Sequence, residues 1–204
     1  MGAKLQQRAV NTRKKILDAA IEMFAASGFS GTTVEDIAVT ADVNKQRIYA
    51  YFSSKQGLFE AALLAVFQQV GMFSAEAVKR AAADPANLSR IMLEDFLRVH
   101  QEHPALWRLL AWANLQGSDS VRALETVRRE ENAALRKIFE SAQKQNLIVP
   151  VKFENWLFSL LALSCFYYSN GRTMRYTHDP EINTPEWKTA LLDDAAMIFS
   201  PHSL

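Results

Sequence analysis

A long apolar stripe between residues 58 and 70 constrains the fold of this chain more than any other feature. Apolar side chains recur there every three or four residues, the spacing that places them on one face of an α-helix. The stripe consists of Leu58, Phe59, Ala62, Leu63, Val66, Phe67 and Val70. We find no alternating strand pattern of useful length and no internal repeat elsewhere in the 204 residues. The sequence therefore predicts an all-α protein.

Glycine and proline mark where the predicted helices begin and end. Proline follows Asp84, His103 and Thr184, and it suits the first position of a helix because no backbone N–H is needed there. Gly28 follows a periodic run and can close its helix in the left-handed conformation. We expect about nine helices, at residues 12–27, 33–40, 44–51, 54–82, 85–102, 104–116, 119–145, 151–169 and 185–199.

Positive charge is concentrated at one end of the chain. Residues 1–57 carry eight lysines and arginines against five acids, whereas the remainder carries fifteen against seventeen. A basic end favours a polyanionic partner for that end. The single cysteine, Cys165, is typical of a reducing compartment, and no apolar export signal or membrane-length run is present. We therefore expect a cytoplasmic protein without a membrane partner.

The segment TTVEDIAVTADVNKQRIYAYF combines two short helices with a tight turn. The first helix is capped by a threonine with an acid three residues later, either Thr32 with Glu35 or Thr33 with Asp36. A three-residue turn then leads to a second helix that Asn44 can cap. This order predicts a helix-turn-helix whose second helix enters the major groove of DNA.

The first residues of this second helix are suited to reading bases. Lys45 and Arg47 can bind guanine O6 and N7, and Gln46 can pair with adenine. Tyr49 can reach a phosphate with its hydroxyl, and Lys55 is placed for another.

A structural interpretation stands beside this one. Tyr49, Tyr51 and Phe52 would be core aromatics, and Lys45 and Arg47 would belong to a solvated face. The preceding cap favours DNA contact for the basic residues and Tyr49, whereas both interpretations stay open for Tyr51 and Phe52 is assigned to the core.

Several elements agree in order and spacing across residues 12–63. A first helix contains Phe24 and ends at Gly28, Thr33 caps the next, and the recognition helix ends in Tyr-x-x-Phe before a Ser-Lys step. The stretches ILDAAIEMFAASGFSGTTVEDIA and VNKQRIYAYFSSKQGLF carry this pattern, which resembles the DNA-binding domain of the TetR (tetracycline-repressor) family. Gln46 and Arg47 stand where the family often has small residues, so no operator sequence can be transferred.

The resemblance implies phosphate contacts by Thr33, Tyr49 and Lys55, and base contacts by position for residues 45–47. With the open cases included, the candidate DNA-binding residues are Thr32, Thr33, Lys45, Gln46, Arg47, Tyr49, Tyr51 and Lys55. We expect a DNA-binding domain at residues 1–55 and a larger helical domain at residues 56–204, with helix 54–82 linking the two.

The resemblance also implies that the larger domain dimerises and binds a small molecule. Its last two helices carry apolar side chains suited to a subunit interface, and a two-fold dimer fits an inverted-repeat operator with recognition helices about 34 Å apart. The candidate interface residues are Trp156, Leu160, Leu163, Trp187, Leu191 and Ala195. The candidate ligand-binding residues are Phe96, Trp107, Arg108, Trp112, Asn114, Phe166, Tyr167 and Asn170. The alternative is that the two tryptophans, Trp107 and Trp112, fill the core.

No cofactor or metal is expected. His100 and His103 lack a clear third ligand, and Cys165 lies in an apolar stretch that keeps thiols protonated. The sequence thus predicts a dimeric transcriptional repressor released from DNA by an unidentified small molecule. The alternative is a DNA-bound structural or protein-interaction factor without an effector; an enzyme is disfavoured because no phosphate-binding loop or nucleophile motif is present.

Overall fold

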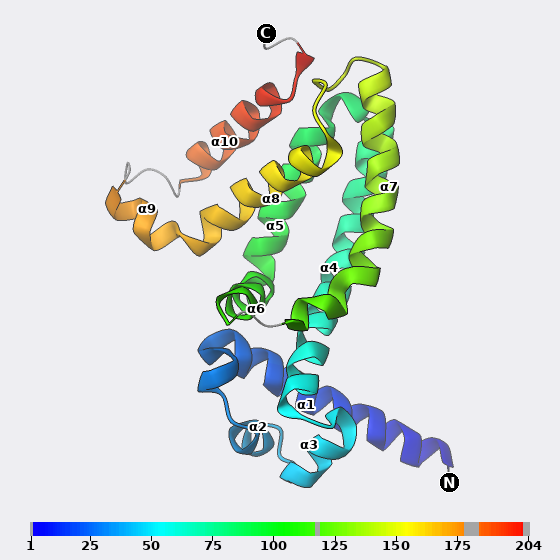
Figure 1. Cartoon of the computed structure of the whole chain (residues 1–204), viewed down its shortest axis with the longest axis vertical. Coiled ribbons are helices and arrows are strands. Elements are labelled where there is room, and N and C mark those ends of the chain that lie inside the picture. The colour runs from blue at the N-terminus through cyan, green and yellow to red at the C-terminus, as the bar shows by residue number, and fades with distance from the viewer. Residues whose placement is uncertain (1, 117–118, 178–183, 202–204) are drawn as a thin grey trace. The chain divides into compact units, whose positions relative to one another are not determined.

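The computed structural model describes residues 2–116, 119–177 and 184–201, except for the side chains of residues 2–5 and 70–74. This part of the chain contains ten α-helices and two short 3-10 helices, and no strand, so the all-α prediction is confirmed (Figure 1). The elements are α1 (Gly2–Gly31), α2 (Val34–Thr40), α3 (Lys45–Phe52), α4 (Lys55–Ala83), η1 (Pro85–Asn87), α5 (Leu88–Glu102), α6 (Pro104–Leu115), η2 (Asp119–Leu124), α7 (Glu125–Lys144), α8 (Phe153–Ser169), α9 (Gly171–Thr177) and α10 (Pro185–Ile198).

Two helical segments have no counterpart in the sequence prediction. α1 begins ten residues before the predicted start at residue 12, and α9 was not expected at all. Both segments lack the apolar stripe on which the prediction depended: residues 6–11 are all exposed, and α9 buries none of its side chains. Periodicity detects a helix through its buried face, so a helix without a fully buried side chain leaves little signal.

The chain divides into two compact units. Unit 1 comprises Met1–Gln69 and Pro104–Thr126, and unit 2 comprises Val70–His103 and Val127–Leu204. α4 contributes its first half to unit 1 and its second half to unit 2. The functional division proposed from the sequence, at residues 1–55 and 56–204, stays a prediction.

Unit 1 is built on an aromatic cluster under the helix-turn-helix. The Phe59 ring meets the Phe24 and Phe29 rings edge-on, with centroids 5.1 and 5.6 Å away. α1 packs on α2 and on α6. Gly28 breaks α1 with φ 72° and ψ 179°, a backbone conformation that is essentially limited to glycine. The positive φ predicted for Gly28 is confirmed, but its ψ is not that of the left-handed helical region, and Gly28 kinks α1, which ends at Gly31.

Unit 2 is held together by α5, which packs against α8 and α10. Trp156 is fully buried, and its ring centroid lies 5.0 Å from that of Phe139 and 5.8 Å from that of Phe153. Its indole Nε1–H donates a hydrogen bond of 2.9 Å to the buried Ser89 Oγ. This bond satisfies the one polar atom of the ring and fixes α8 on α5.

Candidate DNA-binding site

The cap of α2 decides between the two threonines proposed for it. Thr33 is the N-cap: its Oγ1 accepts the Asp36 N–H at 3.1 Å and donates to Asp36 Oδ2 at 2.5 Å. Thr32 is fully buried, and its hydroxyl donates to the carbonyl oxygens of Gly28 at 2.8 Å and Met23 at 3.1 Å. Thr32 therefore closes the end of α1, and its inclusion among the DNA-binding residues was wrong.

The turn between α2 and α3 has the geometry that the sequence predicted. Asp42 takes a positive φ of 53°, and the Val43 N–H bonds to the Ala38 carbonyl at 3.0 Å. Asn44 is the N-cap of α3, with its Oδ1 accepting the Arg47 N–H at 2.9 Å. These bonds satisfy donors that a helix start would otherwise leave open, and so fix the direction of α3.

α3 turns two residues inward and leaves a polar face in solvent. Ile48 and Phe52 are buried, which confirms the core assignment of Phe52. Gln46 and Arg47 are exposed, and Tyr49 keeps 40% of its surface accessible. Arg47 has no ion pair among the described residues, so its guanidinium is available to an incoming base.

Lys45 differs from its neighbours because an acid on α2 already holds it. Its ammonium forms an ion pair with Glu35 and lies 5.7 Å from the Tyr49 ring centroid. The hydrogen bond between the two groups lowers the pKa of Glu35 and raises that of Lys45. Sequence reasoning used Glu35 only as a cap residue and missed this pair. For Lys45 to read a base, DNA must replace Glu35.

The step from α3 to α4 positions the last predicted phosphate contact. Ser53 takes a positive φ of 62°, and Ser54 Oγ accepts the Gly57 N–H at 2.9 Å. Lys55 is half-buried, with its Nζ 4.4 Å from the Phe29 ring centroid. Tyr51 is half-buried beside Phe52.

The predicted ligand-binding residues do not form one site within either unit. Trp107, Arg108, Trp112 and Asn114 belong to α6 in unit 1, where the Trp112 ring packs against Gly28 and Asn114 is exposed. The others lie in unit 2: Phe96 is a buried residue of α5, Phe166 and Tyr167 lie on α8, and Asn170 caps its end. The α6 tryptophans were chosen for their aromatic character, but at least Trp112 packs within its own unit.

Half of the residues predicted for the dimer interface lie in the core of unit 2 and not on its surface. Trp156, Leu160 and Ala195 are at most 2% exposed and belong to the core of unit 2, so they cannot reach a second subunit. The other three predicted interface residues, Leu163, Trp187 and Leu191, line an apolar groove of about 560 Å³ between α8, α9 and α10. Phe166 and Tyr167 line the same groove.

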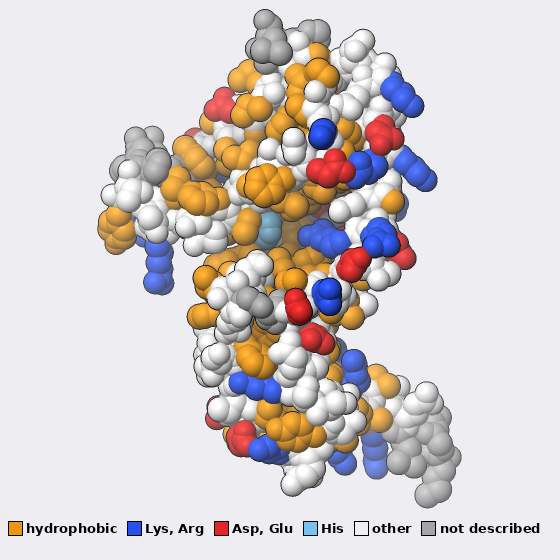
Figure 2. Space-filling view, in the orientation of Figure 1, with side chains coloured by type: hydrophobic (Ala, Val, Ile, Leu, Met, Phe, Trp, Pro, Cys, Tyr) orange, Lys and Arg blue, Asp and Glu red, His pale blue; other side chains and the backbone are white. Residues whose placement is uncertain are grey.

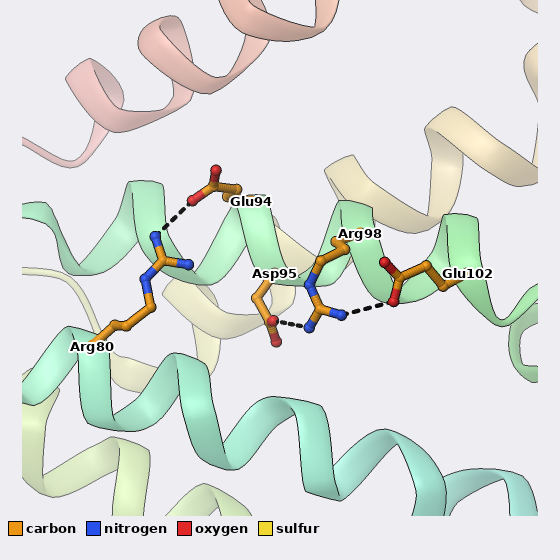
Figure 3. Close-up of polar contacts among 5 residues, drawn as sticks. All are labelled: Arg80, Glu94, Asp95, Arg98 and Glu102. Carbon is orange, nitrogen blue, oxygen red and sulfur yellow. Dashed lines mark hydrogen bonds and ion pairs between the residues drawn. The ribbon is translucent and has the colours of Figure 1, made fainter.

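Unit 2 also contains charged and titratable groups along α5. Figure 3 shows the Arg98 side chain between Asp95 and Glu102, and Arg80 of α4 reaching Glu94 at 2.9 Å. Asp95 is only 4% exposed, and its burial raises the pKa of the carboxyl despite the adjacent Arg98. The Arg80–Glu94 pair joins α4 to α5, whereas the Arg98 contacts with Asp95 and Glu102 lie within α5.

His100 and Cys165 give no sign of metal or redox chemistry. Burial, with a smaller contribution from the Arg128 charge, lowers the pKa of His100 to about 4. Burial raises the pKa of Cys165, which keeps the thiol protonated. No group of three potential metal ligands occurs among the described residues, and no helix in the described segments is long and apolar enough to cross a membrane.

The capped α2–α3 pair on an all-helical body defines a DNA-binding regulator of the helix-turn-helix class. Residues 16–62 match the family model for bacterial regulatory proteins of the tetR family, and residues 85–197 match the tetracyclin repressor-like C-terminal domain. The second match alone covers more than half of the chain. The protein therefore belongs to the TetR family of transcriptional regulators, which is not a family of enzymes.

Relatives and solved structures agree with this assignment. The HTH-type transcriptional repressor NicS of Pseudomonas putida is 29% identical over 169 residues, covering 81% of this chain and 79% of the relative. RutR of Escherichia coli is 34% identical over 118 residues, or 55% of this chain and 53% of the relative. A TetR family regulator from Marinobacter aquaeolei superposes with a TM-score of 0.68 at 20% identity, covering 96% of this chain and 98% of that one. The hemolysin II regulator HlyIIR has the same TM-score at 18% identity, with 94% and 98% covered; these two structures show the fold alone.

Proposed function

We propose that the protein is a homodimeric repressor that binds an inverted-repeat operator through α3 and leaves it when a small molecule binds. The observation that carries this proposal is the exposed face of α3, where Gln46, Arg47 and Tyr49 stand on a helix fixed by the Asn44 cap. NicS, which matches most of this chain, is named a transcriptional repressor, and this favours repression over activation.

Each residue of the proposed interface has a distinct part. Arg47, exposed and without an acidic partner in the described chain, binds guanine in the major groove, and Gln46 pairs with adenine. Phosphate contacts come from Tyr49, from Lys55, and from Thr33 at the N-terminus of α2, where the helix dipole favours an anion. Lys45 joins only when DNA displaces Glu35.

The surface of α8 and α10 supports the homodimer. Phe158, Ala162 and Phe166 are exposed at intervals of four residues and form one stripe on α8. On α10, Met197 and Ile198 are 56% and 63% exposed. Exposed apolar surface of this kind marks a protein interface, and a second copy would cover both helices. In this proposal the stripe replaces the buried residues Trp156, Leu160 and Ala195 as the dimer contact.

The interior of unit 2 supports a small-molecule site. His100 is only 7% exposed, and its Nδ1 makes no hydrogen bond of good geometry among the described residues, although an interaction with the Phe96 backbone raises the pKa of the imidazole against the larger effect of burial. An unpaired buried polar atom costs free energy, and a ligand that pairs with it recovers that cost. The Tyr168 ring lies 6.3 Å from the imidazole, so the ligand we expect has an apolar body with a hydrogen-bonding group. It acts only through a difference in its affinity for the two states.

Selection of bound duplexes from a random DNA pool tests the proposal. We expect an enriched inverted repeat, with Arg47→Ala relaxing the preference at one base pair in each half-site by about 1–3 kcal/mol. Tyr49→Phe should weaken every duplex alike, because a phosphate contact carries no sequence information. A pool without enrichment, and weak binding at physiological salt, would refute operator recognition by α3.

A further inference from the structure

The N-terminal half of α1 extends beyond the part of unit 1 that packs. Residues 6–11 and 13–15 are exposed and Thr12 is half-buried, so this stretch has almost no buried face before Ile16. Figure 1 shows it in dark blue, running past α3 within the same unit. The match to the tetR family model begins only at residue 16, so the segment precedes the matched residues.

The charge of this segment is of one sign. Residues 2–17 contain five lysines and arginines and no acid, and Figure 2 shows Lys and Arg side chains gathered along it. A polar helix that packs on nothing is marginal in water. A polyanion that covers it would supply both the missing contact and the opposite charge.

Two of these cations, Arg8 and Arg13, have no acidic partner among the described residues, unlike Lys14 and Lys15. Lys14 is paired with Asp18 at 2.7 Å, and Lys15 borders a hollow with several acidic residues. Arg8 and Arg13 are exposed and have no ion pair among the described residues. Arg13 lies about 7.5 Å further along the helix axis than Arg8 and is rotated by about 140° around it, so the two long side chains leave different faces of α1.

Arg13 also connects this segment to the recognition helix. Its guanidinium carbon lies 5.1 Å from the ring centroid of Phe52, which is the last residue of α3. The turn of α1 that carries Arg13 is therefore beside the C-terminal end of the helix proposed to enter the major groove. A duplex bound by α3 has its flanking phosphates at the edges of that groove, within reach of long side chains nearby.

We infer that the N-terminal half of α1 is a second DNA-contacting element, in which Arg8 and Arg13 bind the phosphate backbone that flanks the groove occupied by α3. The inference rests on the proposed function, since it needs α3 on DNA. The element adds affinity and salt dependence but no base preference, because its partner is phosphate.

The test compares the salt dependence of binding to the selected duplex for two matched double variants. Arg8→Gln/Arg13→Gln removes the two proposed contacts, and Lys137→Gln/Lys144→Gln removes two exposed cations from α7 in unit 2. We expect the slope of log K against log salt to fall in magnitude by about 2 for the first pair, at about 0.9 per phosphate. The control slope and the preferred sequence should stay as in the wild type.

An unchanged slope in the arginine variant, or an equal fall in the α7 control, would overturn the inference while wild-type operator binding still stands. A wild type that selects no duplex would instead refute the proposed function. Arg13→Lys keeps the charge but changes the contact with Phe52, so a wild-type slope in this variant supports phosphate binding. A slope lowered as far as in the single variant Arg13→Gln, measured beside it, would assign the effect to packing against Phe52 and overturn the inference.

Discussion

Substitution of Gly28 by alanine tests the packing of the DNA-binding unit. Gly28 combines a φ of 72° with a ψ of 179°, and a Cβ placed there would lie 2.7 Å from Trp112 Cδ2 and 2.8 Å from Trp112 Cε3. Alanine must therefore adopt a strained backbone and displace an indole ring at the same time. The indole ring belongs to the half-buried Trp112 of α6 and must shift to make room for the new Cβ.

The expected loss follows from two contributions. A non-glycine residue in this region of φ and ψ costs about 1–3 kcal/mol, and overpacking a filled site costs another 1–3 kcal/mol, roughly. The lower chain entropy of unfolded alanine returns about 0.4–1 kcal/mol. We expect Gly28→Ala to lower the free energy of unfolding by about 3 kcal/mol, or the Tm by about 6–12 °C for a chain of this length.

Urea unfolding followed by tryptophan fluorescence and circular dichroism measures the loss. Gly31→Ala is the matched control: Gly31 is exposed, its φ is not positive, and a Cβ there meets only Ser27 Cβ at 3.3 Å. The control should change stability by less than about 1 kcal/mol. In a Trp112→Ala background Gly28→Ala should cost only its backbone strain. A loss below about 1 kcal/mol in the wild-type background would show that the reasoning from this geometry is wrong.

Three further changes test other parts of the structure. Asn44→Ala removes the cap of α3 and should cost about 1 kcal/mol of stability in thermal unfolding, with Asn44→Asp nearly unchanged. Trp156→Phe leaves the buried Ser89 hydroxyl without its partner and should cost about 2–4 kcal/mol in urea unfolding; a loss under 1 kcal/mol would contradict the role of that bond. Since the pKa of His100 is lowered from 6.5 to about 4, its contribution to stability is present above pH 6.5 and is lost as the pH falls towards 4. About 2 kcal/mol should be lost between pH 8 and pH 5 in the wild type, but not in His100→Gln.

The helix-turn-helix was largely predictable from the sequence because its signals are local. A cap at Asn44, a glycine at position 28 and apolar residues at helical spacing each act within a few residues of the chain. Those features were confirmed one by one, including the burial of Phe52. Thr32 was misassigned because two adjacent threonines satisfy the same local pattern, and only tertiary contacts show which one is buried.

The larger part of the chain was less predictable because its sites depend on which face of each helix is covered. α8 is apolar nearly all round, so the sequence could not separate Trp156 and Leu160, which pack inward, from Phe158 and Phe166, which are exposed. The ion pair between Lys45 and Glu35 joins two helices and has no sequence signature. Arg13 lay in a visible cluster of cations, but only its contact with Phe52 connects it to the recognition helix.

Methylation interference at guanine N7 on the selected operator tests the central claim, that α3 reads the major groove as one of a symmetric pair. We expect two patches of interference about 34 Å apart along the duplex, each including a guanine whose effect disappears in Arg47→Ala. Interference in a single patch would contradict the symmetric dimer. Two patches unaffected by Arg47→Ala would contradict base recognition by α3.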